Sequence, residues 1–208
     1  MKPSTLIKAA TFAAIIASGV AKADNNLILN GDFETTVFGA FSGYNIANAG
    51  TSTIANWTIG GTSVDVIRSS YGAISGNSID MLGTPGPGSL SQGFATVAGH
   101  DYTVSFDLSA NGVGGDSKAL TVTVGAAPAF NFVGDMNNHA TETFNYHATT
   151  TGLTQLTFTS AASGYSGAVI DNVSVTGAVP EPETYAMLLA GLGMVGFIAR
   201  RKAAKKAA

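Results

Sequence analysis

The feature that most constrains the fold is an alternation of apolar and polar residues that recurs in short runs. In "YTVSFDL" (102–108) every second residue is apolar, and "LTVTV" (120–124) repeats the pattern. Successive side chains of a strand point to opposite faces, so such runs predict β-strands with one buried face. Similar runs occupy residues 27–33, 63–67, 78–82, 143–147, 153–160 and 169–175.

Clusters rich in Gly, Pro, Asn and Asp separate these runs. Examples are "GTPGPGS" (83–89), "ANGVGGDSK" (110–118) and "SAASGYSG" (160–167). They supply the positive φ angles and tight reversals that join strands. Within residues 24–178 no run suggests a helix of useful length, and no internal repeat is present. Roughly eight to ten strands within residues 24–178 predict an all-β, two-sheet sandwich.

The charges are segregated along the chain. Of 10 basic residues, three lie in residues 1–23 and five in the last nine residues, which leaves Arg68 and Lys118 between the ends. A central region so poor in cations is unsuited to nucleic acid, because phosphate neutralisation needs Lys and Arg. The chain has no cysteine, which excludes disulfides, thiolate metal sites and a cysteine nucleophile.

The first 23 residues have the layout of a secretory signal peptide. Lys2 and Lys8 precede an apolar stretch, residues 9–20, that is too short to span a bilayer comfortably. The small residues Ala21 and Ala23 follow, with the spacing of a cleavage site. We therefore expect export, with cleavage after Ala23.

The last 30 residues combine a Pro-Glu-Pro box, an apolar stretch and a basic tail. The box is Pro180-Glu181-Pro182, the expected helix is 185–199, and Arg200 and Arg201 begin the tail. About 15 helical residues extend ~22 Å, against ~30 Å for a bilayer core. A permanent membrane anchor is therefore marginal, and the segment suits a transient transmembrane stop that precedes processing.

Box, helix and basic end in this order resemble the PEP-CTERM sorting domain. The resemblance implies a Gram-negative cell that exports exopolysaccharide, and an exosortase-type enzyme that recognises and cleaves near the box. It further implies a transient stay in the inner membrane, followed by the cell surface or a biofilm matrix. The expected division is thus 1–23 signal peptide, 24–178 sandwich and 179–208 sorting signal.

The central region also resembles a known family. Its opening "NGDFE" (30–34) and closing "IDNVSV" (170–175) are the most specific parts, and the likeness covers nearly the whole region. They are similar to the choice-of-anchor C family of bacterial surface proteins and a related domain of plant cell-wall proteins. Both resemble galactose-binding jelly rolls. The resemblance implies a jelly-roll β-sandwich of the kind used by carbohydrate-binding modules.

Catalytic patterns are weak. His100, His139 and His147 form no metal-binding pair by spacing, and no serine sits in a Gly-x-Ser-x-Gly elbow. Carboxylate pairs for glycoside hydrolysis need not be neighbours in sequence. A polysaccharide-processing enzyme therefore stays open as a third hypothesis, behind a non-catalytic carbohydrate-associating surface protein and a purely structural, glycosylated surface protein.

Sugar binding requires aromatic platforms beside polar groups. Candidates are the three rings of the first long loop and two tyrosines beside Gly-rich turns, namely Phe38, Phe41, Tyr44, Tyr71 and Tyr165. The alternative is that these rings cap the sandwich core, since most aromatic side chains are buried. Trp57, in a short strand, is expected in the core.

One carboxylate suggests a structural calcium ion. Strict alternation places Asp171 on the face of Val169, Val173 and Val175, where an unpaired charge costs several kcal/mol. Calcium is a suitable partner because the region holds only two cations. The jelly-roll resemblance implies Glu34 and Asp171 as ligands, with Asp32 a weaker candidate. The alternative is a β-bulge that turns Asp171 to solvent.

Overall fold

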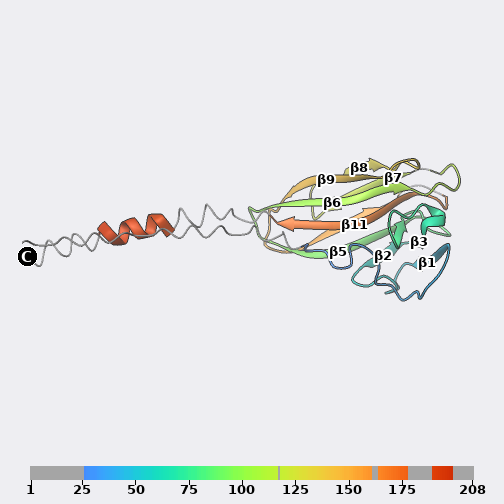
Figure 1. Cartoon of the computed structure of the whole chain (residues 1–208), viewed down its shortest axis with the longest axis horizontal. Helices are drawn as coiled ribbons and strands as arrows, with labels where there is room; N and C mark the ends of the chain where they lie inside the picture. The colour runs from blue at the N-terminus through green and yellow to red at the C-terminus, as the bar shows by residue number, and fades with distance from the viewer. Residues whose placement is uncertain (1–25, 117, 161–163, 178–188, 199–208) are drawn as a thin grey trace, which may run out of the picture. The chain divides into compact units, whose positions relative to one another are not determined.

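The computed structural model of the 208-residue chain describes residues 26–116, 118–160, 164–177 and 189–198. The chain divides into two compact units, one of residues 24–179 and one that combines the two ends. The first unit consists of two antiparallel sheets that face each other (Figure 1). The predicted all-β sandwich is confirmed.

The larger sheet has six strands in the order β1–β3–β4–β11–β6–β9. Their bounds are β1 Tyr44–Asn48, β3 Ser63–Ile67, β4 Ser78–Asp80, β11 Ala168–Gly177, β6 Asp101–Ala110 and β9 Ala140–His147. The smaller sheet has the order β2–β5–β10–β7–β8. Its bounds are β2 Thr58–Gly61, β5 Gly88–Thr96, β10 Gly152–Thr159, β7 Ala119–Val124 and β8 Phe130–Val133. A 3₁₀ turn, η1 (Ser69–Tyr71), follows β3.

The alternating runs became strands with one exception. Residues 27–33, predicted as a strand, form bends and a turn instead. Asn30 and Phe33 adopt left-handed conformations with φ of 52° and 54°, and the Phe33 amide donates to the Asn30 carbonyl. These angles break the pleat, so the prediction for this run was wrong. Strands β1, β5 and β8 lie outside the predicted runs; in β5, Gly and Ser residues resemble a turn.

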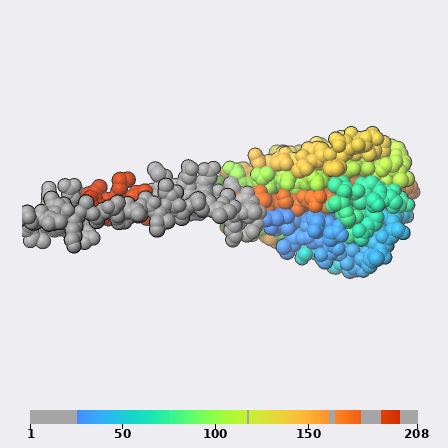
Figure 2. Space-filling view, viewed as in Figure 1, coloured from blue at the N-terminus to red at the C-terminus, as the bar shows by residue number. Residues whose placement is uncertain are grey.

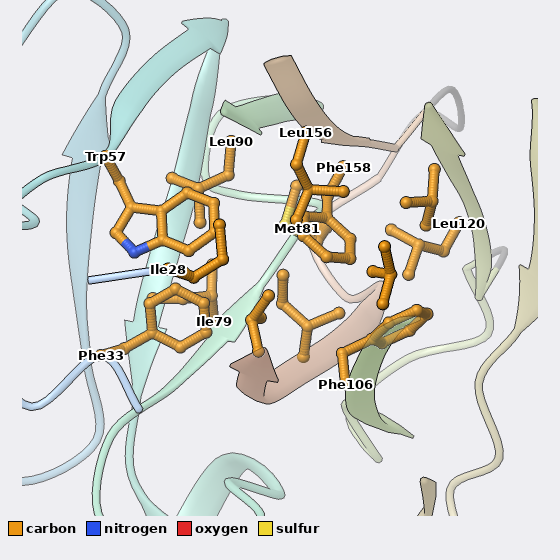
Figure 3. Close-up of a cluster of buried hydrophobic side chains, with 14 of the residues drawn as sticks. Ile28, Phe33, Trp57, Ile79, Met81, Leu90, Phe106, Leu120, Leu156 and Phe158 are labelled. Carbon is orange, nitrogen blue, oxygen red and sulfur yellow. The ribbon is translucent and has the colours of Figure 1, made fainter. Parts of the chain in front are cut away.

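The core lies between the sheets and is lined by alternate residues of both. Figure 3 shows Leu90, Leu156 and Phe158 of the five-stranded sheet near Ile79 and Phe106 of the six-stranded one. Trp57 is 4% exposed, which confirms its prediction as a core residue. Its ring lies 5.3 Å from that of Phe33 and 6.3 Å from that of Phe158. Burying such rings dominates the packing free energy of a small sandwich.

The opening segment of the domain lies along its last strand. The Leu27 amide donates to the Val175 carbonyl at 2.8 Å, and the Val173 amide donates to the Gly31 carbonyl at 2.9 Å. A Cβ on Gly31 would overlap the Val173 carbonyl oxygen, so glycine is required at this approach. Figure 2 shows β11 as an orange band between the blue opening segment and the green β6. The two most specific sequence motifs are thus neighbours in space.

Strand β11 contains a bulge that changes the orientation of Asp171. The register against β6 shifts between Asp171 and Ser174, and Asn172 has a φ of 48°. Ile170 and Val173 both belong to the core cluster, so Asp171 lies on the outer face of the sheet. Strict alternation was therefore wrong at this residue. The bulge does not turn it to solvent, because Asp171 is fully buried.

In the second unit, residues 189–198 form a helix within the predicted range 185–199. No helix among the described residues is long and apolar enough to cross a membrane. The predicted signal peptide with Ala21 and Ala23 lies outside the described residues. The same holds for Pro180, Glu181 and Pro182 of the box, and for Arg200 and Arg201 of the tail.

Candidate ligand-binding site

A pocket of about 250 Å³ opens on the outer face of the six-stranded sheet. Val64 and Val66 of β3 enter the core, so Asp65 and Ile67 between and beside them point outward into this pocket. Loops at one end of the sheet complete the walls. The lining residues are Tyr44, Asp65, Ile67, Tyr71, Thr84, Asn111, Val113, Gly114, Asp116, Tyr165 and Ser166. We call it the tyrosine pocket.

Three of the five predicted aromatic residues line the tyrosine pocket. Tyr44 begins β1 and Tyr71 ends η1, and their rings meet edge to face with centroids 5.3 Å apart. Tyr165 comes from the loop between β10 and β11, a distant part of the sequence. Tyr44 is 41% exposed and Tyr165 is 64% exposed, so neither side chain is buried in the hydrophobic core. The strand order brings these three rings together.

Phe38 and Phe41 lie elsewhere. Both are half-buried and pack against the hydrophobic core, with their rings in an edge contact 6.3 Å apart. The guanidinium of Arg68 covers the Phe41 ring at 4.9 Å. Phe38 and Phe41 therefore cap the sandwich core, which was the alternative to a role in sugar binding.

A buried carboxylate forms the polar floor of the pocket. Asp65 is 3% exposed and lies on β3 between two core valines. Its Oδ1 accepts a hydrogen bond from the Thr84 amide at 3.1 Å, and its Oδ2 accepts one from the Thr84 hydroxyl at 2.9 Å. Desolvation raises the pKa of Asp65, although the Thr84 hydrogen bonds partly oppose this. The sequence signal was an acid inside the apolar strand "SVDVI".

A second buried acid, Asp80, supports the pocket from β4. It stands opposite Asp65 in the sheet register. Its Oδ2 accepts from the Asn111 amide nitrogen at 2.8 Å, and its Oδ1 accepts from the backbone amides of Leu82 and Gly167. Burial raises the pKa of Asp80 to about 6, and repulsion from Asp65 adds to this. These bonds hold Asn111 and the 164–167 loop in place.

The rim of the pocket is held by hydrogen bonds between two loops. The Tyr165 amide donates to Asp116 Oδ2 at 2.8 Å, and Lys118 Nζ donates to Ser166 Oγ at 2.6 Å and to its carbonyl at 2.7 Å. Partial burial lowers the pKa of Lys118, and the negative charges of Asp80 and Asp116 partly offset this decrease. Asp65, Asp116, Asn111 and Ser166 were all missed by sequence reasoning, since no local pattern links them.

The predicted calcium ligands meet a different set of partners. Asp171 Oδ2 accepts from the Ser75 amide, the Ser75 hydroxyl and the Ser78 hydroxyl, and Oδ1 accepts from the Asn172 amide. Desolvation raises the pKa of Asp171 and these bonds oppose it. N–H and O–H donors therefore compensate the buried charge.

Glu34 reaches the same loop, where its Oε1 accepts from the Asn77 amide at 2.6 Å. Asp32 is exposed, and its Oδ1 accepts from the Glu34 amide at 3.4 Å. The described residues contain no group of three or more His, Cys, Asp or Glu side chains that could hold a metal ion. A calcium ion bound by Glu34, Asp171 and Asp32 stays a prediction.

Three kinds of comparison place the chain among known proteins. Residues 178–202 match the PEP-CTERM protein-sorting motif, so the chain carries a signal for export and sorting through the membrane. A search of curated proteins found no match.

Several solved structures are similar. A CBM4 structure is 20% identical, with 73% of this chain and 99% of that chain covered and a TM-score of 0.46. A family 35 carbohydrate binding module from Clostridium thermocellum is 18% identical, with 64% and 98% covered and a TM-score of 0.36. The exo-beta-1,3-galactanase Pc1,3Gal43A from Phanerochaete chrysosporium is 19% identical, with 65% and 30% covered and a TM-score of 0.39.

The family assignment rests on the sandwich itself. A family model described as "Protein of unknown function (DUF642)" matches residues 26–176, which include every strand of both sheets except the last residue of β11. The chain therefore belongs to the DUF642 family.

Proposed function

We propose that this protein is an exported, non-catalytic surface or exopolysaccharide-matrix protein that binds carbohydrate in the tyrosine pocket. The observation that carries the proposal is the convergence of Tyr44, Tyr71 and Tyr165 around buried polar side chains. A sugar ring presents apolar C–H faces and polar hydroxyl edges. Aromatic rings and a few fixed polar groups in one concave site complement both.

The polar groups are already held in position. Asp65 and Asn111 are buried, and their hydrogen bonds with Thr84 and Asp80 fix their orientation. Such pre-organisation reduces the entropy lost on binding. At about 250 Å³ the pocket is slightly smaller than the ~300–1,000 Å³ of pockets for drug-sized ligands, so it suits one sugar unit of a longer chain.

The other sheet offers no comparable surface among the described residues. The outward positions of β5, β7 and β10 include Ser89, Ser91, Thr121, Thr123 and Thr157, and no aromatic ring. Phe130 and Phe132 of β8 stand opposite the core residues Val122 and Leu120, so they face inward. A ring-lined carbohydrate site is therefore favoured on the six-stranded sheet.

The sorting motif supports the cellular part of the proposal. An exosortase-type enzyme would recognise the Pro-Glu-Pro box while the apolar helix holds the chain in the inner membrane of a Gram-negative cell. Processing would then release the sandwich to the surface or the matrix. A domain that binds the cell's own exopolysaccharide would be retained there.

A binding experiment tests the proposal. Purified full-length protein is titrated with a panel of neutral, acidic and amino-sugar polysaccharides, alongside Tyr44→Ala and Tyr165→Ala. We expect each variant to lose about tenfold or more in affinity for a polysaccharide that binds, because truncating an anchor ring that the ligand covers costs roughly 2 kcal/mol or more. The melting temperature should change little for Tyr165→Ala, whose ring is largely exposed.

Leu153→Ala is the matched control, because Leu153 is 80% exposed on β10 of the other sheet. Full affinity in both tyrosine variants would refute the pocket. If no polysaccharide binds, a structural surface protein without glycan specificity is the better description. Release of reducing ends from any polymer would instead reveal catalysis.

A further inference from the structure

The tyrosine pocket is acidic. Asp65 and Asp116 line it, and no Lys, Arg or His is among its lining residues. Asp65 is 97% buried, and the partners that the structure gives its carboxylate are the neutral amide and hydroxyl of Thr84. An ionised carboxylate that burial strips of water is stabilised when a cation approaches it. A ligand with a positive charge would stabilise the ionised Asp65 in this way.

Lys118 lies beside the pocket, where its ammonium group already has protein partners. Lys118 donates to the carbonyl and hydroxyl oxygens of Ser166, and its charge interacts with both Asp80 and Asp116. The pocket and the sheet behind it thus hold three carboxylates, those of Asp65, Asp80 and Asp116, and the Lys118 ammonium group interacts with the last two. The region in and behind the pocket keeps a net negative charge when these groups are ionised.

The walls add a second attraction for cations. The faces of Tyr44, Tyr71 and Tyr165 carry the negative part of the ring quadrupole. A cation within about 6 Å of such a ring gains roughly 0.5–2 kcal/mol, with the larger value in a desolvated site. Aromatic walls with carboxylates between them are therefore suited to an ammonium group attached to a small, partly apolar body.

The net charge of the whole sandwich also favours a cationic ligand. The described residues of the sandwich include ten acidic residues against the two bases Arg68 and Lys118. Such a field attracts a cationic polymer over distances of about one Debye length, roughly 10 Å at 0.1 M salt, and repels an acidic one. Polysaccharides rich in uronic acid are therefore disfavoured as ligands.

We infer that the tyrosine pocket selects amino sugars with a free, protonated amine, in a polysaccharide of hexosamine units that is at least partly deacetylated. This inference rests on the proposed function and names its ligand class. The sugar ring lies against the tyrosines, its hydroxyls bond to Asn111 and Ser166, and its ammonium group lies between Asp65 and Asp116. N-acetylation removes the charge and with it the selectivity.

The experiment compares two probes that differ only in this group. Full-length protein is titrated by calorimetry with a glucosamine oligomer and with the N-acetylglucosamine oligomer of the same length. We expect the free-amine oligomer to bind at least tenfold more tightly at low salt, and this preference to shrink as salt is added. Asp116→Asn should remove most of the preference.

Asp116→Asn is a suitable variant because its amide oxygen can still accept the Tyr165 amide, so the rim stays closed. Glu142→Gln on β9 is the matched control, since it removes the same charge outside the pocket. It should keep the preference. Asp65→Asn is a second variant with the same expected loss, read together with its melting temperature to show that it folds.

The possible results distinguish a failure of the amine selectivity from a failure of the proposed carbohydrate binding. Equal affinity for both oligomers, lost in Tyr44→Ala, would overturn the amine selectivity and leave carbohydrate binding intact. A preference that falls to the same extent in Glu142→Gln as in Asp116→Asn and Asp65→Asn would show general attraction to an acidic surface, and would also overturn it. If neither oligomer binds while a neutral polysaccharide does so through Tyr44, the inference alone fails.

Discussion

At the scale of single residues, the outer face of the six-stranded sheet contains buried carboxylates. Asp65, Asp80 and Asp171 are each at most 3% exposed. Each carboxylate accepts hydrogen bonds, which limits the free-energy cost of its burial. Among the donors are a hydroxyl for Asp65, the Asn111 side-chain amide for Asp80 and a hydroxyl for Asp171. All three have a raised pKa, and desolvation is the largest cause in each case. They fix loops in place at a cost in stability near neutral pH.

Asp80 leads to a prediction about pH. Its pKa is about 6 in the folded protein against 3.8 for an ordinary aspartate, so the folded state binds more protons between these values. The free energy of unfolding should therefore fall as pH rises from about 4 to about 6 and level off above. The contribution is on the order of 3 kcal/mol.

Melting temperatures measured from pH 4 to pH 7 check this. Wild-type protein should melt at a higher temperature near pH 5 than at pH 7, and Asp80→Asn should lose most of that difference. Asp135→Asn, an exposed acid, is the control. An unchanged pH dependence in Asp80→Asn would contradict the assignment.

At the scale of elements, β11 organises the domain. It pairs with β6 along most of its length, with β4 at its start, and with the opening segment beyond the bulge. The bulge places Asp171 beside Ser75 of the loop before β4 and Ser78 at the start of β4. Glu34 of the opening motif contacts the same loop through Asn77. Both ends of the domain thus meet over one strand.

Calcium binding at this junction can be tested by melting. Hydroxyl groups rotate, so Ser75 and Ser78 could turn their oxygens toward an ion shared by Asp171 and Glu34. We expect calcium to raise the melting midpoint of the protein and excess chelator to lower it, with neither effect in Glu34→Gln. The same midpoint in calcium and in chelator would show that hydrogen bonds alone compensate Asp171.

At the scale of the whole molecule, the chain joins a β-sandwich to a sorting signal. The sandwich has a hydrophobic core of its own and forms a separate compact unit. Removal of the chain after the box would therefore leave every element of the core and the tyrosine pocket in place.

Processing at the box is testable in the native cell. Surface protein should lack the residues after about Pro182, and alanine at Pro180 and Glu181 should leave a longer form in the inner membrane. The reason for the expected effect is that proline disfavours helical backbone at the residue before it, and an extended box would be accessible to an enzyme. Mass spectrometry of surface-extracted protein checks this, and an intact "ARRKAAKK" end would refute processing.

The sequence alone determined the parts of this protein that depend on local pattern. Alternation in 102–108 and 120–124 predicted strands, and the lone Trp57 was placed in the core. The ordered box, helix and basic end identified the sorting motif. These signals need only the period of the backbone or a contiguous stretch of residues.

Only the tertiary structure decided where the candidate site lies. Tyr44, Tyr71 and Tyr165 were candidates, but nothing local distinguished them from Phe38 and Phe41, which pack against the core. Strand order brings Asp65 and the 111–116 loop beside Tyr165, and the bulge at Asn172 reverses the face of Asp171. Sheet topology and a single positive φ are properties of the assembled fold, because they depend on contacts between residues far apart in the chain.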